Sequence, residues 1–271
     1  MRLNAYEKEV RKEIEQWQHG STSFLMQAIN WAMQPVDWVV EQVVPADVVD
    51  HASTAIEQGL SMLNNASEWT HDDDSLLQAA READIDVEDP EALRNEPLEK
   101  LDKLARSFFT QNAVLAAIEG GGTGLGGLVF IAADIPLLFG INLRLIQQIG
   151  SAYGFAMRGP EFQPLILSIF NVAASGKRES RNDAMREISV AAAAFANDQS
   201  YKGRVSGTFT DQNRHLPREI AKNIVGRKLA QSIPIAGAAV GAGVNYWFTQ
   251  ETAETSFMLF RALYLDRKER S

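Results

Sequence analysis

Apolar positions recur at helical spacing along most of the chain. In residues 4–18, Tyr6, Val10, Ile14 and Trp17 fall at three- to four-residue intervals, which places them on one face of an amphipathic helix. No stretch shows the sustained alternation of apolar and polar residues that is typical of a strand. The pattern predicts an all-α fold, a multi-helix bundle without a sheet.

Two segments are rich in glycine and alanine and almost free of charge. Residues 107–143 carry only Glu119 and Asp134 as charged side chains, and residues 229–250 carry none. Small residues let helix backbones approach closely, so we expect both segments to form apolar central helices of the bundle. Shorter apolar stripes predict further helices after Pro45, from Leu98 onward, over 160–175, over 182–198 and over 216–231.

The chain is expected to form a single helical domain over residues 1–271. Residues 1–69 are interpreted as an N-terminal helical block, and residues 96–271 as the core helices. Between them, residues 70–95 are acidic and contain a short helix at most, so we expect an acidic excursion on the surface.

The uncharged run 229–250 has two interpretations. Its 22 residues would form about 33 Å of helix, which is long enough to cross a bilayer. Glycine and alanine contribute little transfer free energy, however, and Pro234 and Asn245 weaken the run as a membrane span. Burial against the similar segment 113–133 is the interpretation that we favour.

Composition narrows the function classes. The absence of cysteine excludes disulfides, thiolate metal sites and a cysteine nucleophile, and it suits a reducing cytoplasm. A net charge of −9 argues against a nucleic-acid partner. The first residues are charged and lack the apolar core of a secretory signal, so we expect a cytoplasmic protein. The four histidines are scattered and no metal or cofactor motif is complete, so we predict neither.

Charge is distributed unevenly along the chain. Residues 37–99 carry 17 acidic side chains against two arginines, whereas the helix predicted over 216–231 is basic. We expect this basic surface to contact an anionic membrane or a membrane protein complex. The alternatives are a solvated helix face and an internal partner for the acidic residues. The predicted basic surface comprises Arg214, Arg218, Lys222, Arg227 and Lys228.

The glycine run over residues 120–127 contains a literal G-x-G-x-x-G at Gly122, Gly124 and Gly127. A dinucleotide site needs this motif between a strand and a helix, with an acidic residue about 20 positions later. Here a helix precedes the motif, no acid stands at that distance, and the lysine of a P-loop is missing. We therefore interpret the run as a break between two helices.

The Asp-Ile-Pro sequence at residues 134–136 also has two interpretations. In one, Asp134 is the N-cap of a helix whose first turn contains the proline. In the other, an acid among apolar residues is a paired or ligand-binding group, with Arg144 or Arg106 as its partner. Glu119 is a second acidic candidate, which makes a pocket beside both acids and the glycine run a possible ligand site.

Several short motifs together resemble the EcsC protein family. Each motif is weak alone, but their order and spacing extend over nearly the whole chain. They are Tyr6-Glu7 with Trp17, Glu119-Gly120 before the glycine run, Asp134-Ile135-Pro136, Tyr153-Gly154, and Ile233-Pro234 followed by Gly237, Gly241 and Asn245-Tyr246.

The resemblance implies a protein linked to membranes or secretion. The family takes its name from a protein associated with a bacterial ABC-type exporter, and it offers no catalytic residue that can be transferred to this chain. We therefore name no residue as catalytic. The residues discussed above and the family motifs together give seven ligand-binding candidates. They are Glu119, Gly122, Gly124, Gly127, Asp134, Arg144 and Asn245.

The leading functional hypothesis is a non-enzymatic accessory protein at the cytoplasmic face of the membrane, or on a membrane transport or secretion complex. It rests on a basic helix next to an uncharged small-residue segment. One alternative is an enzyme or a small-ligand or lipid-binding protein with a pocket near Asp134 and the glycine run. Another is a soluble scaffold whose basic helix binds an acidic protein partner.

Overall fold

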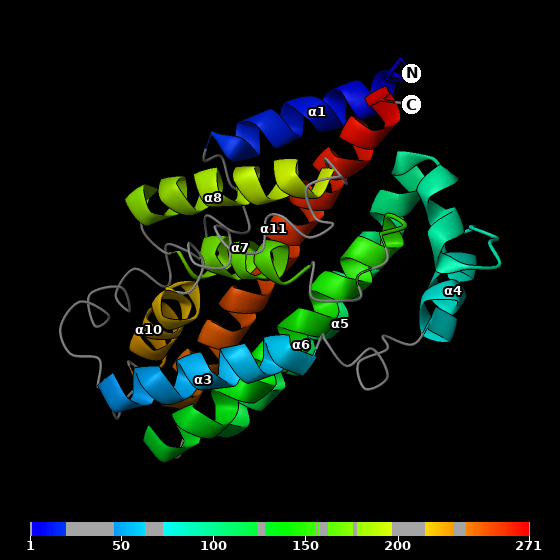
Figure 1. Ribbon diagram of the computed structural model, residues 1–271. Helices are drawn as coiled ribbons and strands as arrows, with labels where there is room; N and C mark the ends of the chain where they lie inside the picture. The colour runs from blue at the N-terminus through cyan, green and yellow to red at the C-terminus, as the bar shows by residue number, and fades with distance from the viewer. Residues whose placement is uncertain are drawn as a thin grey trace.

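Three long helices form the centre of the molecule in the computed structural model (Figure 1). They are α5 (Leu98–Thr123), α6 (Leu128–Ala152) and α11 (Gly237–Arg270). α5 and α6 form an antiparallel hairpin, and α11 packs against both of them. The structure describes residues 2–19, 46–62, 73–123, 128–155, 157, 162–175, 178–196, 215–229 and 237–270.

Shorter helices cover this centre. They are α1 (Ala5–Gln18), α3 (Ala46–Met62), α4 (Asp73–Glu82), the 3₁₀ helix η1 (Pro90–Asn95), α7 (Gln163–Ala174), α8 (Arg178–Ala196) and α10 (Leu216–Leu229). α3 packs on α6 and α10, α7 packs on α8 and α11, and α1 lies against α11. The described part of the chain contains no strand, and the predicted all-α fold is confirmed.

The acidic segment 70–95 contains more helix in its described part, residues 73–95, than its composition predicts. Its described part contains α4 and η1, which bury Leu76, Ala80 and Leu93. α4 contacts both α5 and α6. The few apolar residues of this segment are therefore sufficient to attach it to the bundle, while its acidic side chains face outward.

The uncharged run 229–250 is largely inside the protein where the structure describes it. Val244, Asn245, Trp247 and Phe248 are all buried, which agrees with the favoured interpretation of packing within the bundle. Among the described helices, none combines the length and the apolar character needed to cross a membrane.

Both termini lie at one end of the bundle, which we call the proximal end (Figure 1). There Lys268 of α11 donates a hydrogen bond to the buried Glu7 of α1. Glu7 also forms a capping box with Asn4, because each side chain accepts a hydrogen bond from the backbone N–H of the other residue. The C-terminal end of α5 and the N-terminal ends of α6 and α11 lie at the opposite end, the distal end.

Candidate functional site

Asp134 lies inside α6, which already begins at Leu128. Pro136 is within the same helix, so the prediction that the aspartate caps a new helix is wrong. The apolar residues 128–133 continue the helix upstream of the aspartate. Packing of α6 against α5 and α11 outweighs the cost of a proline that lacks its N–H.

A buried salt bridge joins Asp134 to Lys228 of α10. The lysine Nζ also donates a hydrogen bond to Oδ1 of Asn245 on α11. Nδ2 of this asparagine lies 3.4 and 3.5 Å from the two carboxylate oxygens of Asp134. The exposed fraction is 2% for the aspartate and 0% for both partners, so all three groups are shielded from solvent. We call Asp134, Lys228 and Asn245 the distal cluster.

Burial sets the electrostatics of the distal cluster. Loss of solvation lowers the pKa of Lys228, and the Asp134 carboxylate opposes this by favouring the charged ammonium. A buried charge is costly unless it is paired and hydrogen-bonded, and here each charge has the other as its partner. The cluster therefore ties α6, α10 and α11 together.

Two members of the distal cluster, Asp134 and Asn245, are sequence-predicted ligand candidates that the structure brings together. The proposed partners of the aspartate, Arg144 and Arg106, are both exposed, and Lys228 takes that place instead. The sequence does contain a signal for this lysine. It borders one uncharged segment while Asp134 interrupts another, and two such segments that pack together must pair their isolated charges.

The remaining ligand candidates either lie away from the distal cluster or fall outside the residues that the structure describes. Glu119 and Gly122 are in the last turns of α5, and Gly124 and Gly127 fall outside the described residues. Arg144 is exposed on α6 and does not join the distal cluster. The first half of the glycine run, residues 120–123, belongs to the last turn of α5, and the second half lies outside the described residues, so the predicted helix break stays a prediction.

The predicted basic surface is divided by the helical rotation of α10. Arg218 and Lys222 are exposed, whereas Arg227 and Lys228 are buried on other faces of the helix, and Arg214 lies outside the described residues. The guanidinium of Arg227 stacks on the ring of Trp247 at 4.1 Å. A basic surface that includes Arg227 and Lys228 is thus not present, and the exposed basic residues of α10 are fewer than predicted.

Arg218 has a partner within the protein. Its Nη2 lies 3.2 Å from Oδ1 of Asp50 on α3, which belongs to the acidic region 37–99. This contact agrees with the alternative in which the basic helix pairs with the chain's own acids. Both side chains are largely exposed, so the pair contributes little to stability.

Among the side chains that the structure describes, four large apolar ones are exposed, and all four lie on the α5–α6 hairpin. They are Val114 (50%), Leu115 (42%), Ile118 (66%) and Leu137 (44%). Nδ2 of Asn112 donates a hydrogen bond to Oε1 of Gln148 over 3.0 Å, which sets the register between the two helices. All four residues lie on the distal side of this bond, and we call them the apolar hairpin surface.

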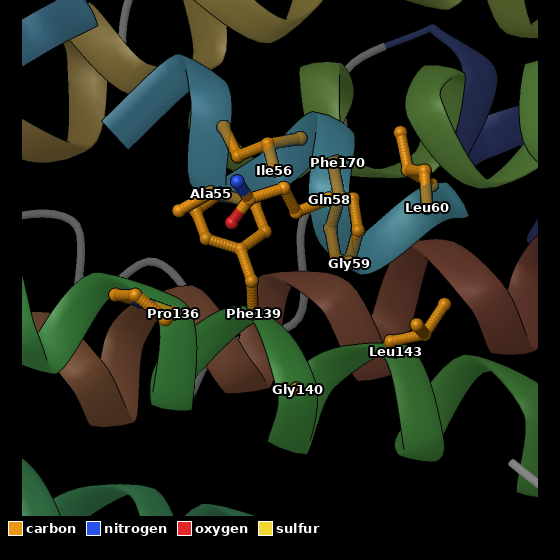
Figure 2. A pocket seen from close by; sticks show the side chains of 10 residues that line it. All are labelled: Ala55, Ile56, Gln58, Gly59, Leu60, Pro136, Phe139, Gly140, Leu143 and Phe170. Atoms are coloured by element: carbon orange, nitrogen blue, oxygen red, sulfur yellow. The ribbon is translucent and has the colours of Figure 1, made fainter. Parts of the chain in front are cut away.

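A cavity of about 170 Å³ lies between α3 and α6 (Figure 2). Pro136 lines it, whereas Asp134, which is two residues earlier and about 200° around the helix axis, contacts α10 and α11. The cavity and the distal cluster therefore lie on different sides of α6. This is not the predicted pocket beside Asp134, since none of the ligand candidates lines it.

A second buried polar cluster, which the sequence patterns did not reveal, lies toward the proximal end. Asp102 of α5 accepts hydrogen bonds of 2.7 Å from the hydroxyls of Tyr6 and Tyr153. Nε of Arg261 on α11 lies 3.0 Å from the same carboxylate. Burial raises the pKa of Asp102, and the nearby arginine opposes the rise. We call Tyr6, Asp102, Tyr153 and Arg261 the proximal cluster.

The Tyr153-Gly154 motif also closes α6. Gly154 has a φ of +73°, and its N–H bonds to the carbonyl of Ser151 at 2.8 Å, while the Phe155 N–H bonds to the carbonyl of Gly150 at 3.1 Å. These two bonds form a Schellman motif, in which glycine is the residue suited to the left-handed position. A Cβ at Gly154 would also lie 2.4 Å from the backbone nitrogen of Arg94.

These features define an all-α bundle in which two buried polar clusters tie the central helices together. The chain belongs to the EcsC protein family, whose model matches residues 8–265, and the resemblance noted in the sequence is thereby confirmed. It is 23% identical over 258 residues to the uncharacterized protein YdbA of Bacillus subtilis strain 168, covering 92% of this chain and 89% of that protein. It is 28% identical over 163 residues to Protein EcsC of the same organism, covering 60% and 63%. No solved structure matches the chain.

Proposed function

We propose that the chain is an accessory protein that docks on the cytoplasmic face of a membrane through the apolar hairpin surface. The observation that carries this proposal is the exposure of Val114, Leu115 and Ile118 on neighbouring turns of one helix. Apolar residues scattered singly over a surface need no explanation, but a group of large ones on one face indicates a contact surface.

The distribution of charge supports a lipid partner. Between Arg106 and Arg144 the sequence carries only Glu119 and Asp134, and Asp134 is neutralised internally by Lys228. Arg144 is exposed, and it precedes Gln148 by four residues, so it lies at about the same level along the hairpin as the apolar hairpin surface. An arginine at this level can reach lipid phosphates while the apolar side chains enter the layer beneath them.

The free energies available from these contacts predict weak, reversible binding to the membrane. Complete burial of one large apolar side chain contributes about 1.5–3 kcal/mol, and these side chains are already half buried in the free protein. A basic residue near an anionic leaflet adds roughly 1 kcal/mol. The sum of a few kcal/mol corresponds to weak docking that depends on anionic lipid and weakens with added salt.

Co-sedimentation with phosphatidylglycerol-containing vesicles tests the proposal. The double variant Val114→Asp/Ile118→Asp should reduce the vesicle partition coefficient at least about tenfold, because two apolar contacts are lost and two like charges meet the anionic surface. Thr110→Asp/Gln111→Asp is the matched control, since both residues are exposed near the middle of α5, on the proximal side of the Asn112–Gln148 bond. Exposed substitutions of either kind should leave the fold intact, which circular dichroism can verify.

Equal sedimentation of the two double variants would contradict docking through the apolar hairpin surface. Binding to native bacterial membranes without binding to pure lipid vesicles would indicate a membrane protein complex as the partner. Either outcome would overturn the proposed lipid contact.

A further inference from the structure

The cavity between α3 and α6 has an apolar floor. Ile56 of α3, Phe139 and Leu143 of α6 and Phe170 of α7 are buried and line it (Figure 2). None of these side chains offers a hydrogen bond, so water in the floor would lose partners that it has in bulk solution. The floor therefore favours an apolar occupant.

Small residues on the two facing helices leave this space unfilled. Gly59 of α3 and Gly140 of α6 both line the cavity and have no side chain to fill it. A Cβ at Gly59 would meet nothing within 4 Å, which shows open space next to this residue. Protein interiors are otherwise packed as densely as organic crystals, so a gap of this size between two helices leaves room for a ligand.

The mouth of the cavity is more exposed and more polar than its floor. Gln58 and Pro136 at the mouth are exposed, and Gly59 and Gly140 are partly exposed. Figure 2 shows the amide of Gln58 above the ring of Phe139, where it borders the opening. A bound molecule would meet polar surroundings at this side and hydrocarbon at the other, which is the chemistry of an amphiphile.

We propose that this cavity binds the terminal segment of a single alkyl chain, as found in a fatty acid. Its volume of about 170 Å³ is similar to that of an engineered cavity of about 150 Å³ that binds benzene, so it has room for about six carbon atoms. The rest of the chain and its polar head leave through the mouth beside Gln58. This inference is independent of the proposed membrane docking, because the cavity and the apolar hairpin surface share no residue.

Titration with cis-parinaric acid, a fatty acid that fluoresces in apolar surroundings, tests the proposal in the absence of detergent and vesicles. The wild-type protein should show saturable fluorescence that decanoic acid displaces. Gly59→Leu places a side chain into the open space and should weaken binding at least about tenfold. Gly243→Leu is the matched control, because a Cβ at this glycine of α11 also meets nothing within 4 Å and the residue does not line the cavity.

Two results of this titration would contradict the alkyl-chain site. Equal binding by Gly59→Leu and Gly243→Leu, or no saturable binding by the wild-type protein, would overturn the proposal. Should Gly59→Leu fail to fold by circular dichroism, Ala55→Leu at the mouth provides a second obstruction with the same expected loss. Vesicle sedimentation of Gly59→Leu should equal that of the wild-type protein, so a failure of the alkyl-chain site and a failure of membrane docking are distinguishable.

Discussion

Lys228 and Asp134 are 94 positions apart in the sequence and form a salt bridge from which solvent is excluded. The contact joins α10, whose sequence predicts a basic surface, to α6, whose sequence predicts an apolar central helix. One acid within an uncharged stretch is thus paired with one base that borders another.

Replacing Asp134 by Asn is expected to destabilise the protein by about 3–5 kcal/mol, because the buried ammonium of Lys228 loses its counter-charge. Urea unfolding followed by circular dichroism measures the change. Adding Lys228→Met removes the unpaired charge, so the double variant should regain most of the lost stability. A double variant no more stable than Asp134→Asn alone would show that charge pairing is not the cause.

Two glycines should respond in opposite ways to alanine. Gly59→Ala should stabilise the protein by about 0.5–1 kcal/mol, because the residue is inside a helix with open space beside it. Gly154→Ala should destabilise it by more than about 1 kcal/mol, because the backbone is left-handed there and the added Cβ meets the backbone of Arg94. Thermal unfolding of both variants gives the comparison, and a shift of the same sign would contradict it.

The proximal cluster should make stability depend on pH. Burial raises the pKa of Asp102 above its ordinary value of 3.8, so the folded protein holds this proton more tightly than the unfolded chain does. The contribution of this group therefore falls as pH rises from about 3.8 through the raised value. The free energy of unfolding of the wild type minus that of Asp102→Asn should therefore decrease as pH rises across that window.

Urea unfolding of both proteins at several pH values between about 4 and 7 measures this difference. A constant difference, or one that grows with pH, would show that Asp102 is not the titrating group. The hydroxyls of Tyr6 and Tyr153 donate to different oxygens of Asp102, so asparagine keeps an acceptor for only one of them. That loss is the same at every pH, whereas the loss of the titrating proton is not, so the slope with pH reports on the charge.

Membrane docking should depend on Arg144 more than on Arg218. Arg144→Glu is expected to reduce binding to anionic vesicles about 10- to 30-fold, since it reverses a charge level with the apolar hairpin surface. Arg218→Glu makes the same change in net charge, but Arg218 is on α10 and faces Asp50, so a much smaller effect is expected. Vesicle sedimentation at two salt concentrations compares them. Equal losses would mean that only net charge matters.

The sequence predicts two of the three residues of the distal cluster as site residues. The N-cap at Asp134 and the surface position of Lys228 were predicted wrongly, each for a physical reason. Asp134 is a candidate because an acid within an apolar segment needs a partner, and Asn245 is one because it belongs to the motifs that resemble the EcsC family. The cap predicted for Asp134 failed because Pro136 is tolerated inside a helix that other helices support. Arg227 and Lys228 were assigned to a surface because a run of basic residues usually is one, and their burial depends on Trp247 and Asp134, which are distant in sequence.

The sequence by itself determined the helices, because their apolar stripes recur at a spacing that depends only on local geometry. It also determined which segments are central, since stretches without charge lose little on burial. Only the tertiary structure decided the partner of each buried charge, the cluster around Asp102 and the cavity between α3 and α6. These depend on which faces of separate helices meet, and that is settled by packing over the whole molecule.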